Sequence, residues 1–470
     1  TLIYERPDRP KWGFDGEVTE DGRYLVISAW KGTEQENGVF YKDLEGEGKK
    51  GEVKELLSEF DASYQFLGND EEIFYFLSDL DAPRKRVIGI DLDEPQRSRW
   101  QEVIPPSGRV LENVKLVGDS FVALYIEDAC HGISIYDKEG KLLEDLDLPG
   151  KGTVELFDVQ RSSSDFFYGY SSFNAPKSIY HYDLGSKERG LFKEASLPFD
   201  PEDFQTEQVF YESKDGTEIP LFISRKKGMG LDGGLPTYLY GYGGFNIPLT
   251  PDFSASKMAW MQMGGLYVQA NLRGGGEYGK KWHKAGKEHN KQNVFDDFIS
   301  AAEWLIEKNY TTPEKLAING RSNGGLLIGA SMTQRPDLYK VCIPVVGVLD
   351  MLRFHEFTIG WAWVSDYGSP EEPEDFEHLI SYSPLHNIED GKEYPATLVV
   401  TGDHDDRVYP AHSFKFAARL QEAQGGGEPI LLRVETNAGH GVGKPTSKLI
   451  EEETDILTFM ANKLGMEIDN

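Results

Sequence analysis

Ser322 lies at the centre of the pattern G-R-S-N-G at 320–324. A short apolar segment, 316–319, precedes this pattern, and a run of small and apolar residues, 325–332, follows it. A G-x-S-x-G sequence between a strand and a helix is typical of a sharp turn that presents a nucleophilic serine hydroxyl, and its glycines let the backbone turn without a side-chain clash. The pattern predicts acyl transfer at Ser322. The alternative is an ordinary surface serine in a glycine-rich turn.

A serine nucleophile needs a base, and the sequence provides an acid-rich loop and then a histidine downstream of Ser322. The loop follows the apolar segment 397–401 and contains three aspartates, Asp403, Asp405 and Asp406. His440 lies between two glycines after a further apolar segment, 430–435. The order serine, acid, histidine is that of α/β-hydrolases. We expect His440 to accept the Ser322 proton and one aspartate to orient His440; the pattern alone does not choose among the three.

Two further glycine-rich stretches, 240–245 and 273–279, raise the question of anion binding. The backbone N–H of Asn323, directly after the nucleophile, is the expected first donor of an oxyanion hole. Tyr242, within Y-G-Y-G-G-F at 240–245, is a candidate second donor through its hydroxyl, and a plain glycine-rich turn is the alternative. The second stretch, 273–279, lacks the G-K-[ST] ending of a phosphate-binding loop, so we exclude nucleotide binding there.

The elements that would position these residues occupy 206–470, where predicted strands and helices alternate. Strands are expected at 237–240, 266–270, 316–319, 341–346, 397–400 and 430–434. Helices are expected at 293–308, within 412–420 and within 448–464. Alternation of this kind favours a mostly parallel, doubly wound sheet. The region 206–470 is therefore predicted to be an α/β-hydrolase catalytic domain.

Residues 1–205 repeat with a different period. Four similar segments end in Asp43, Asp91, Asp137 and Asp183, at spacings of 48, 46 and 46 residues. Short alternating runs of Val, Ile, Tyr and Phe lie between them. A period in the forties with several short strands per unit is typical of β-propeller blades, and unrelated β-hairpins are the alternative. We predict about four propeller blades here, with the repeated aspartates at turns or strand ends.

Composition excludes several classes of function. The 470 residues carry a net charge of −30, which disfavours binding to nucleic acid. No apolar run approaches the length of a membrane span, and the two cysteines, Cys130 and Cys342, make neither a disulfide framework nor a zinc site. We expect no metal, no cofactor, no nucleic-acid partner and no membrane association. Without a visible signal peptide a cytoplasmic location is expected, with periplasmic or secreted locations as alternatives.

Six motifs add a resemblance to these inferences. They are Y-G-Y-G-G-F-N at 240–246, N-L-R-G-G-G-E-Y-G at 271–279, N-G-R-S-N-G-G-L-L at 319–327, S-P-L-H-N at 383–387, D-H-D-D-R-V at 403–408 and A-G-H-G at 438–441. Together with the propeller repeats, they resemble the prolyl oligopeptidase family of serine peptidases. The resemblance implies a serine endopeptidase that hydrolyses short proline-containing peptides on the C-terminal side of proline through an acyl-enzyme.

The resemblance also implies particular roles for residues around the triad. Within D-H-D-D-R-V, Asp405 takes the position of the triad acid. Arg407 takes the position of a group that holds a substrate carbonyl, and a surface ion pair with Asp403 or Asp406 is the alternative. Tyr242 takes the position of the oxyanion donor.

Specificity is implied by an aromatic segment, 357–367. Its second tryptophan, Trp363, takes the position of the residue that stacks on the substrate proline. A flat indole suits a flat pyrrolidine ring, and an apolar slot rejects charged side chains. The rest of this apolar wall would be formed by Phe245, Val348, Tyr367 and Val408. Core packing is the alternative for each of the five.

The chain departs from the family in two ways. Arg321 stands where glycine is frequent, and we attach no function to it. Family members are longer at the N-terminus, so we expect the propeller to be incomplete here and a further N-terminal segment or chain to complete both domains. Two other functions stay open: a sister oligopeptidase with different specificity, for a basic residue or an acyl-aminoacyl group, and a non-catalytic propeller that binds a partner.

Overall fold

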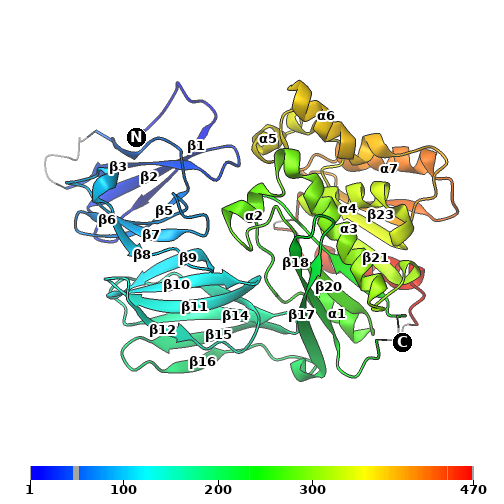
Figure 1. The fold of residues 1–470 in the computed structure, drawn as a ribbon, viewed down its shortest axis with the longest axis horizontal. Coiled ribbons are helices and arrows are strands. Elements are labelled where there is room, and N and C mark those ends of the chain that lie inside the picture. Colours follow the sequence, from blue (N-terminus) through cyan, green and yellow to red (C-terminus); the bar gives the residue numbers. More distant parts are fainter. Residues whose placement is uncertain (1, 46–51, 232, 442, 468–470) are drawn as a thin grey trace. The chain divides into compact units, whose positions relative to one another are not determined.

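The computed structural model describes residues 2–45, 52–231, 233–441 and 443–467. Two compact units divide the chain (Figure 1). The described residues of the first unit fall within 1–172, 176–196 and 277–281, and those of the second within 173–175, 197–276 and 282–470. Each unit has its own sheets and its own core, and each is described by itself.

Four sheets of four strands make up the first unit, and each sheet takes its strands in chain order. The first sheet holds β1 (Trp12–Val18), β2 (Tyr24–Lys31), β3 (Asn37–Asp43) and β4 (Lys54–Leu57), and the second holds β5 (Tyr64–Asp70), β6 (Ile73–Ser78), β7 (Arg86–Asp91) and β8 (Gln101–Ile104). The third holds β9 (Val110–Val117), β10 (Ser120–Glu127), β11 (Cys130–Asp137) and β12 (Leu142–Leu146), and the fourth holds β13 (Thr153–Leu156), β14 (Asp165–Ser172), β15 (Ala175–Asp183) and β16 (Arg189–Lys193). One sheet for each sequence repeat agrees with the prediction of four blades.

Strand β6 shows how the blades bury both faces. Successive side chains of a strand point to opposite faces. Phe74 and Phe76 pack into a core shared with the first sheet, whereas Tyr75 and Leu77 pack into a core shared with the third. The Val-, Phe- and Tyr-rich alternation of this region therefore creates a continuous series of cores between successive sheets.

The repeated aspartates end the third strand of each sheet. Each carboxylate accepts a hydrogen bond from a backbone N–H of the following turn, at 2.9 Å for Asp43, 2.9 Å for Asp91, 2.8 Å for Asp137 and 2.7 Å for Asp183. Aspartate stabilises turns in this way because its short side chain reaches the backbone just beyond it. The prediction that these residues lie at strand ends is confirmed.

An eight-stranded mixed sheet forms the centre of the second unit, in the order β17-β18-β20-β19-β21-β22-β23-β24. The bounds are β17 (Phe204–Glu212), β18 (Glu218–Lys226), β19 (Thr237–Tyr240), β20 (Leu266–Ala270), β21 (Leu316–Arg321), β22 (Val341–Val345), β23 (Ala396–Gly402) and β24 (Ile430–Glu435). The two pairs that involve β18 are antiparallel, and the other pairs are parallel. The predicted strands are all present, and β17 and β18 extend the sheet at one edge.

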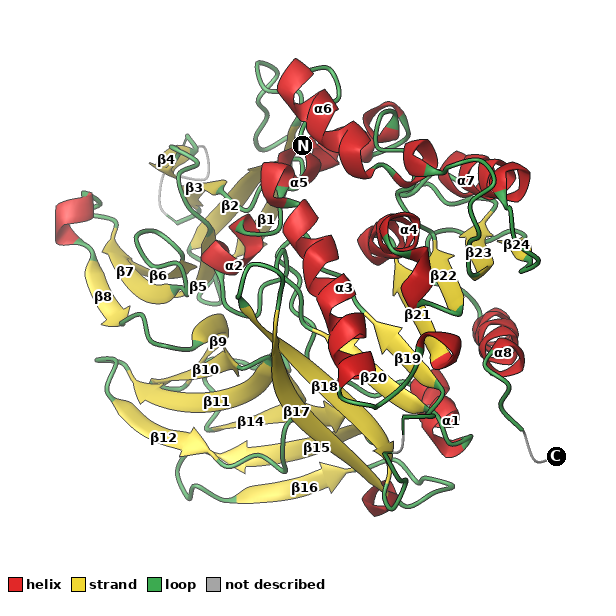
Figure 2. Cartoon of the chain, turned by 45° about the vertical axis from the view of Figure 1, so that its right-hand side comes forward, coloured by secondary structure: helices red, strands yellow, loops and turns green. Residues whose placement is uncertain are grey.

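Helices cover both faces of this sheet (Figure 2). The α-helices in the described part of the chain are α1 (Ala255–Gln262), α2 (Lys280–Lys284), α3 (Gln292–Glu307), α4 (Asn323–Gln334), α5 (Val364–Tyr367), α6 (Pro373–Tyr382), α7 (Ala411–Ala423) and α8 (Thr446–Lys463). Helix α1 packs against α8, and α3 packs against α4. The helix predicted at 293–308 corresponds to α3, whose apolar residues Val294, Phe295, Phe298, Ala302 and Leu305 are buried. The unit is an α/β-hydrolase domain.

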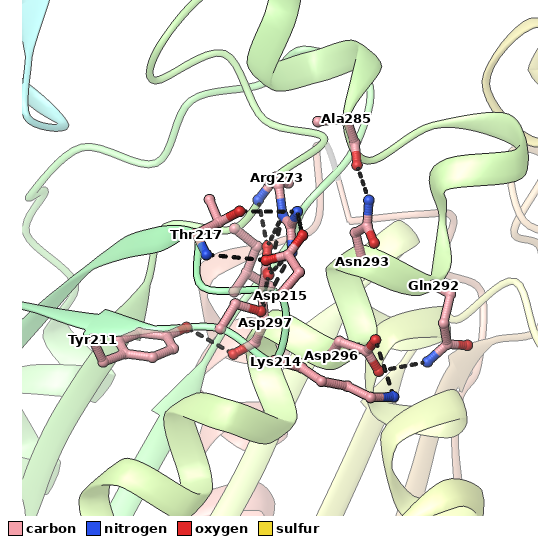
Figure 3. A network of polar contacts seen from close by, with 12 residues as sticks. Tyr211, Lys214, Asp215, Thr217, Arg273, Ala285, Gln292, Asn293, Asp296 and Asp297 are labelled. Carbon is pink, nitrogen blue, oxygen red and sulfur yellow. Dashed lines mark hydrogen bonds and ion pairs between the residues drawn. The ribbon is translucent and has the colours of Figure 1, made fainter.

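A buried ion pair anchors the glycine-rich segment that follows β20 (Figure 3). The Arg273 guanidinium donates to Asp297 Oδ1 of α3 at 2.6 Å, and the Arg273 backbone N–H donates to Asp297 Oδ2 at 3.1 Å. Ser213 donates to the same carboxylate at 2.6 Å, and Asp215 accepts from Arg273 at 2.5 Å. Asp297 is fully buried. Arg273, at the start of this glycine run, therefore holds the segment against α3.

Candidate active site

The nucleophile candidate Ser322 lies in a strained turn between β21 and α4. Its backbone has φ 58° and ψ −118°, a conformation that costs a residue with a side chain of order 1–3 kcal/mol. The Ser322 backbone N–H donates to Val345 O of β22 at 2.9 Å, which ties the turn to the neighbouring strand. The turn places the Ser322 side chain at the carboxyl end of the parallel strands, where α/β sheets bind ligands.

The two glycines of G-x-S-x-G are required by close contacts between backbones. A methyl group at Gly320 would lie 2.4 Å from Gly324 O, and one at Gly324 would lie 2.8 Å from Gly241 O. Neither site has room for a side chain, because these distances are shorter than any real contact of a Cβ atom. The spacing of the motif therefore follows from the packing of the turn against itself and against the end of β19.

Asp405 and His440 are in direct contact. His440 Nδ1 donates to Asp405 Oδ2 at 2.7 Å. Asp405 Oδ1 accepts from the backbone N–H groups of Arg407 and Val408 at 3.0 Å and 2.8 Å, and the residue is 1% exposed. A carboxylate held in this way fixes the tautomer of the histidine, so that Nε2 is the acceptor left for a serine proton.

The other two aspartates of this loop point elsewhere. Asp403 is exposed, and its carboxylate contacts His404 Nδ1 at 2.6 Å. Asp406 is also exposed. The geometry therefore separates three candidates that the sequence pattern left equivalent, and it brings Asp405 to the histidine.

Backbone hydrogen bonds join the loop of Asp405 to the loop of His440. Asp403 N–H donates to Glu435 O and His404 N–H donates to Ala438 O, both at 3.0 Å. On its other side, the histidine loop approaches the nucleophile turn: a methyl group at Gly441 would lie 3.2 Å from Arg321 Nη2. The acid and histidine segments are thus joined by backbone hydrogen bonds, and the histidine loop meets the side chain of the residue that precedes Ser322.

The two predicted oxyanion donors lie on neighbouring segments. Asn323 is the first residue of α4, where backbone N–H groups have no acceptor within the helix. Burial raises the pKa of Tyr242 well above its usual range, and the positive charge of Arg407 acts against that rise. The Tyr242 hydroxyl therefore stays protonated and able to donate.

Arg407 does not form the surface ion pair that was its alternative role. The side chain is exposed, and among the residues that the structure describes no carboxylate pairs with its guanidinium. The Arg407 carbonyl accepts a hydrogen bond from Thr358 at 3.2 Å. The loop is thus held by its backbone while the charged group remains available near Tyr242.

The five residues of the predicted apolar wall belong to one cluster of the hydrolase core. Trp363 lies in the short 3-10 helix η8 (Gly360–Trp363) and is 8% exposed. Val348, Tyr367 and Val408 are buried in the same cluster, and Phe245 packs against it. The rings of Phe245 and Tyr367 meet edge to face at 5.4 Å. Burial of this kind is also what core packing gives, so contact with a proline stays a prediction.

Two polar side chains near the nucleophile were not identified from the sequence. The Asn323 amide donates to Tyr242 O at 2.6 Å and accepts from Tyr367 and Lys291, each at 3.0 Å. Asn323 was predicted through its backbone alone. Lys291 lies in a polar stretch whose composition resembles that of a solvated helix start, so no local signal marks it.

Two absences apply to the described ranges of the chain. No group of three or more His, Cys, Asp or Glu side chains there is arranged to hold a metal ion. No helix in the same ranges combines the length and the apolar character needed to cross a membrane.

The sequence of this chain matches the models of one protein family and is similar to several known proteins. The model of the prolyl oligopeptidase family matches residues 251–467, and that of the prolyl oligopeptidase N-terminal β-propeller domain matches 1–195. A prolyl endopeptidase of Elizabethkingia meningoseptica is 46% identical over 96% of this chain and 63% of its own length. A prolyl endopeptidase of Dictyostelium discoideum is 42% identical over 100% of this chain and 64% of its own length. The chain thus spans somewhat less than two thirds of these relatives.

Solved structures agree with the sequence comparisons. A structure from a study of two prolyl endopeptidases matches with a TM-score of 0.94 and 41% identity, over 99% of this chain and 68% of that one. Prolyl oligopeptidase B from Galerina marginata, bound to a 35-residue hydrolysis and macrocyclization substrate, matches with a TM-score of 0.95 and 36% identity, over 100% of this chain and 67% of that one. The chain belongs to the prolyl oligopeptidase family.

Proposed function

We propose that this chain is the catalytic part of a serine endopeptidase that cleaves short peptides on the C-terminal side of proline through an acyl-enzyme. The observation that carries the proposal is the buried Asp405 carboxylate bonded to the half-buried His440, together with the strained turn that holds Ser322. A buried carboxylate bonded to a histidine at a nucleophile turn is the arrangement that activates a serine. The names of the relatives support the substrate class.

The proposed chemistry has two halves. In the first, His440 Nε2 takes the proton of the Ser322 hydroxyl while the oxygen attacks the carbonyl carbon of the proline residue. The proton then passes to the leaving amine, the C–N bond breaks, and an ester to Ser322 remains. In the second, His440 takes a proton from water, whose oxygen attacks the ester carbon; the C–O bond to Ser322 then breaks, the proton passes from His440 to the Ser322 oxygen, and the peptide acid leaves. Asp405 stabilises the histidine cation in both halves without taking the proton.

The oxyanion of each tetrahedral intermediate needs donors that are already in place. The Asn323 backbone N–H and the Tyr242 hydroxyl are the two that we assign. Preorganised donors aimed at developing charge usually supply the largest single part of such catalysis, and the loss of one costs about 10²- to 10³-fold in kcat. Both donors lie on segments that leave the carboxyl edge of the sheet, close to the nucleophile.

Proline preference is assigned to the apolar wall. Trp363 would stack on the pyrrolidine ring, with Phe245, Val348, Tyr367 and Val408 forming the rest of the slot. An apolar pocket discriminates by shape and by the cost of burying a charge. Arg407 would bind the carbonyl of the residue next to the cleaved bond, since its guanidinium is exposed and unpaired with any carboxylate in the described residues.

The decisive experiment is hydrolysis of a peptide reporter with proline before the dye. We expect turnover by the wild-type chain, none above background by Ser322→Ala, and covalent labelling of Ser322 by a fluorophosphonate. Activity that survives Ser322→Ala would refute the assignment of the nucleophile. A reporter panel with lysine, arginine, alanine and acetylated residues in place of proline separates this proposal from a sister oligopeptidase of different specificity.

The cellular compartment of the enzyme is a further proposal. We place the enzyme in the cytoplasm, because its two cysteines, Cys130 and Cys342, are both free, as is usual for proteins of a reducing compartment. Fractionation of cells that express the native gene, with activity measured in each fraction, tests this location. Activity recovered mainly outside the cytoplasmic fraction would contradict it.

A further inference from the structure

Lys291 is a buried cation that the triad chemistry does not use. It immediately precedes α3 and is 1% exposed. Burial lowers the pKa of Lys291 to about 8, against the opposing effect of the Asp366 charge. An ammonium group is costly to bury unless its N–H groups are hydrogen-bonded. The hydrogen-bond acceptors of Lys291 Nζ therefore indicate which segments this buried ammonium group holds in place.

The acceptors of Lys291 belong to the two segments assigned to the oxyanion hole. Lys291 Nζ donates to Gly243 O at 2.9 Å and to Asn323 Oδ1 at 3.0 Å. Gly243 directly follows Tyr242, and Asn323 directly follows Ser322. The Lys291 side chain thus bonds to both segments, at the residue after Tyr242 in one and at the residue after Ser322 in the other.

The Asn323 side chain adds a direct hydrogen bond between the two segments. Its Nδ2 donates to Tyr242 O at 2.6 Å, and its Oδ1 also accepts from the Tyr367 hydroxyl at 3.0 Å. An ammonium group can only donate and a carbonyl oxygen can only accept. Lys291 therefore dictates which way the Asn323 amide faces, and that orientation in turn holds the Tyr242 backbone.

Given the serine-peptidase function proposed above, we propose that Lys291 is a positioning residue that fixes the separation of the two oxyanion donors. It reaches neither the substrate nor the reacting atoms. It acts by holding the segment of Tyr242 and the first turn of α4 together. Because oxyanion donors are aimed at the charge of the transition state, the spacing that Lys291 sets affects turnover more than substrate binding.

Lys291→Met tests the proposal, because methionine keeps the length and the apolar stem but removes every N–H donor. We expect kcat on the proline reporter to fall roughly 10- to 100-fold, less than the loss of a donor itself, with KM within about twofold. Affinity for a peptide aldehyde ending in prolinal falls by a similar factor, because its adduct with Ser322 carries an oxyanion. Affinity for the product peptide acid stays unchanged.

Lys257→Met is the matched control. Lys257 is a partly buried lysine of the same unit, its pKa is likewise lowered to about 8 by burial, and it lies over the rings of Tyr240 and Tyr267. We expect this variant to keep the kcat and the aldehyde affinity of the wild type. An unchanged kcat in Lys291→Met, or equal losses in both variants, would overturn the proposal, as would parallel losses of aldehyde and product affinity.

A second variant covers the case in which Lys291→Met does not fold, as judged by its thermal transition. Asn323→Ala keeps the backbone N–H donor but removes the bridge to Tyr242. It is expected to lose kcat and aldehyde affinity together, with KM within about twofold. An Asn323→Ala variant with wild-type kcat would overturn the proposal.

A small activated ester tests the positioning role of Lys291 independently of the proposed preference for proline. Hydrolysis of p-nitrophenyl acetate requires the nucleophile and the oxyanion hole but no proline slot. If the wild type hydrolyses the ester and not proline peptides, the proline assignment fails, and Lys291→Met must still slow ester hydrolysis for the positioning role to stand. A wild type that hydrolyses neither overturns both proposals.

Discussion

The strained turn at Ser322 predicts that two equally inactive variants differ in stability. Ser322→Ala and Ser322→Gly both remove the hydroxyl and should both abolish turnover. They differ in the backbone, because alanine keeps the Cβ atom that is unfavourable at φ 58° and glycine does not. The glycine variant should therefore be the more stable of the two.

The size of the difference follows from two opposing terms. A side-chain-bearing residue in this region of φ and ψ costs about 1–3 kcal/mol. Glycine loses more chain entropy on folding, which offsets roughly 0.5–1 kcal/mol of the relief. We expect a net gain of about 1 kcal/mol for Ser322→Gly over Ser322→Ala, and hence a rise in the Tm of the hydrolase unit of roughly 2–4 °C.

Thermal and urea unfolding of the two variants, followed by tryptophan fluorescence, measure this gain. Asn309→Gly is the control: Asn309 is exposed and has φ 58°, but asparagine accepts positive φ readily, so its replacement should change stability by only a few tenths of a kcal/mol. A Ser322→Gly variant no more stable than Ser322→Ala would refute the view that the nucleophile turn is strained. A gain equally large at Asn309 would show that the effect is not specific to the turn.

Three further predictions follow from individual contacts. Asp405→Asn should lower kcat about ten-thousandfold with little change in KM, because the histidine tautomer is no longer fixed; steady-state kinetics on the proline reporter measure it, and a loss under tenfold would contradict it. Trp363→Ala should lower kcat/KM for proline peptides by at least about tenfold while leaving p-nitrophenyl acetate hydrolysis nearly unchanged; equal losses on both substrates would point to core packing. Asp297→Asn should destabilise the hydrolase unit by about 3–5 kcal/mol, since it removes the buried carboxylate of Arg273 and leaves only the half-exposed one of Asp215. By contrast, Asp215→Asn should cost under about 1 kcal/mol at neutral pH because Asp215 is half exposed. Arg273 lowers the pKa of Asp215 from 3.8 to about 2, so the stabilisation from this carboxylate is present above pH 4 and is lost as the pH falls toward 2; acid titration of unfolding should show a smaller loss in Asp215→Asn.

The sequence predicted the parts of this molecule whose signals are local. The nucleophile turn is defined by five consecutive residues, and the strands β19 to β24 are short apolar runs that alternate with helices. The blade repeats were visible because each repeat ends its third strand with the same turn-stabilising aspartate. Strands β17 and β18 were not predicted, because a hairpin between a propeller and a parallel sheet gives no periodic signal that assigns it to either.

The choice among three candidates for the proposed triad acid shows why local patterns leave some questions open. Asp403, Asp405 and Asp406 share one short loop and one residue type. What distinguishes Asp405 is that its carboxylate turns inward, accepts two backbone N–H groups, and meets a histidine 35 residues away. Without the resemblance to a known family, that assignment requires the fold.

The bridge through Lys291 shows what a sheet by itself does not determine. Strands β19 and β21 are adjacent and parallel, and their last paired residues are Tyr240 and Asn319. Tyr242 and Asn323 lie beyond those residues, where no ladder hydrogen bond sets the distance between the two chains. A buried cation, Lys291, lies at that point and donates to the Asn323 amide, 32 residues away in sequence, and to the Gly243 carbonyl, 48 residues away. Because buried polar groups are costly unless they are hydrogen-bonded, the presence of these two groups just past the end of the sheet argues that they position the oxyanion donors, where backbone pairing no longer sets the distance.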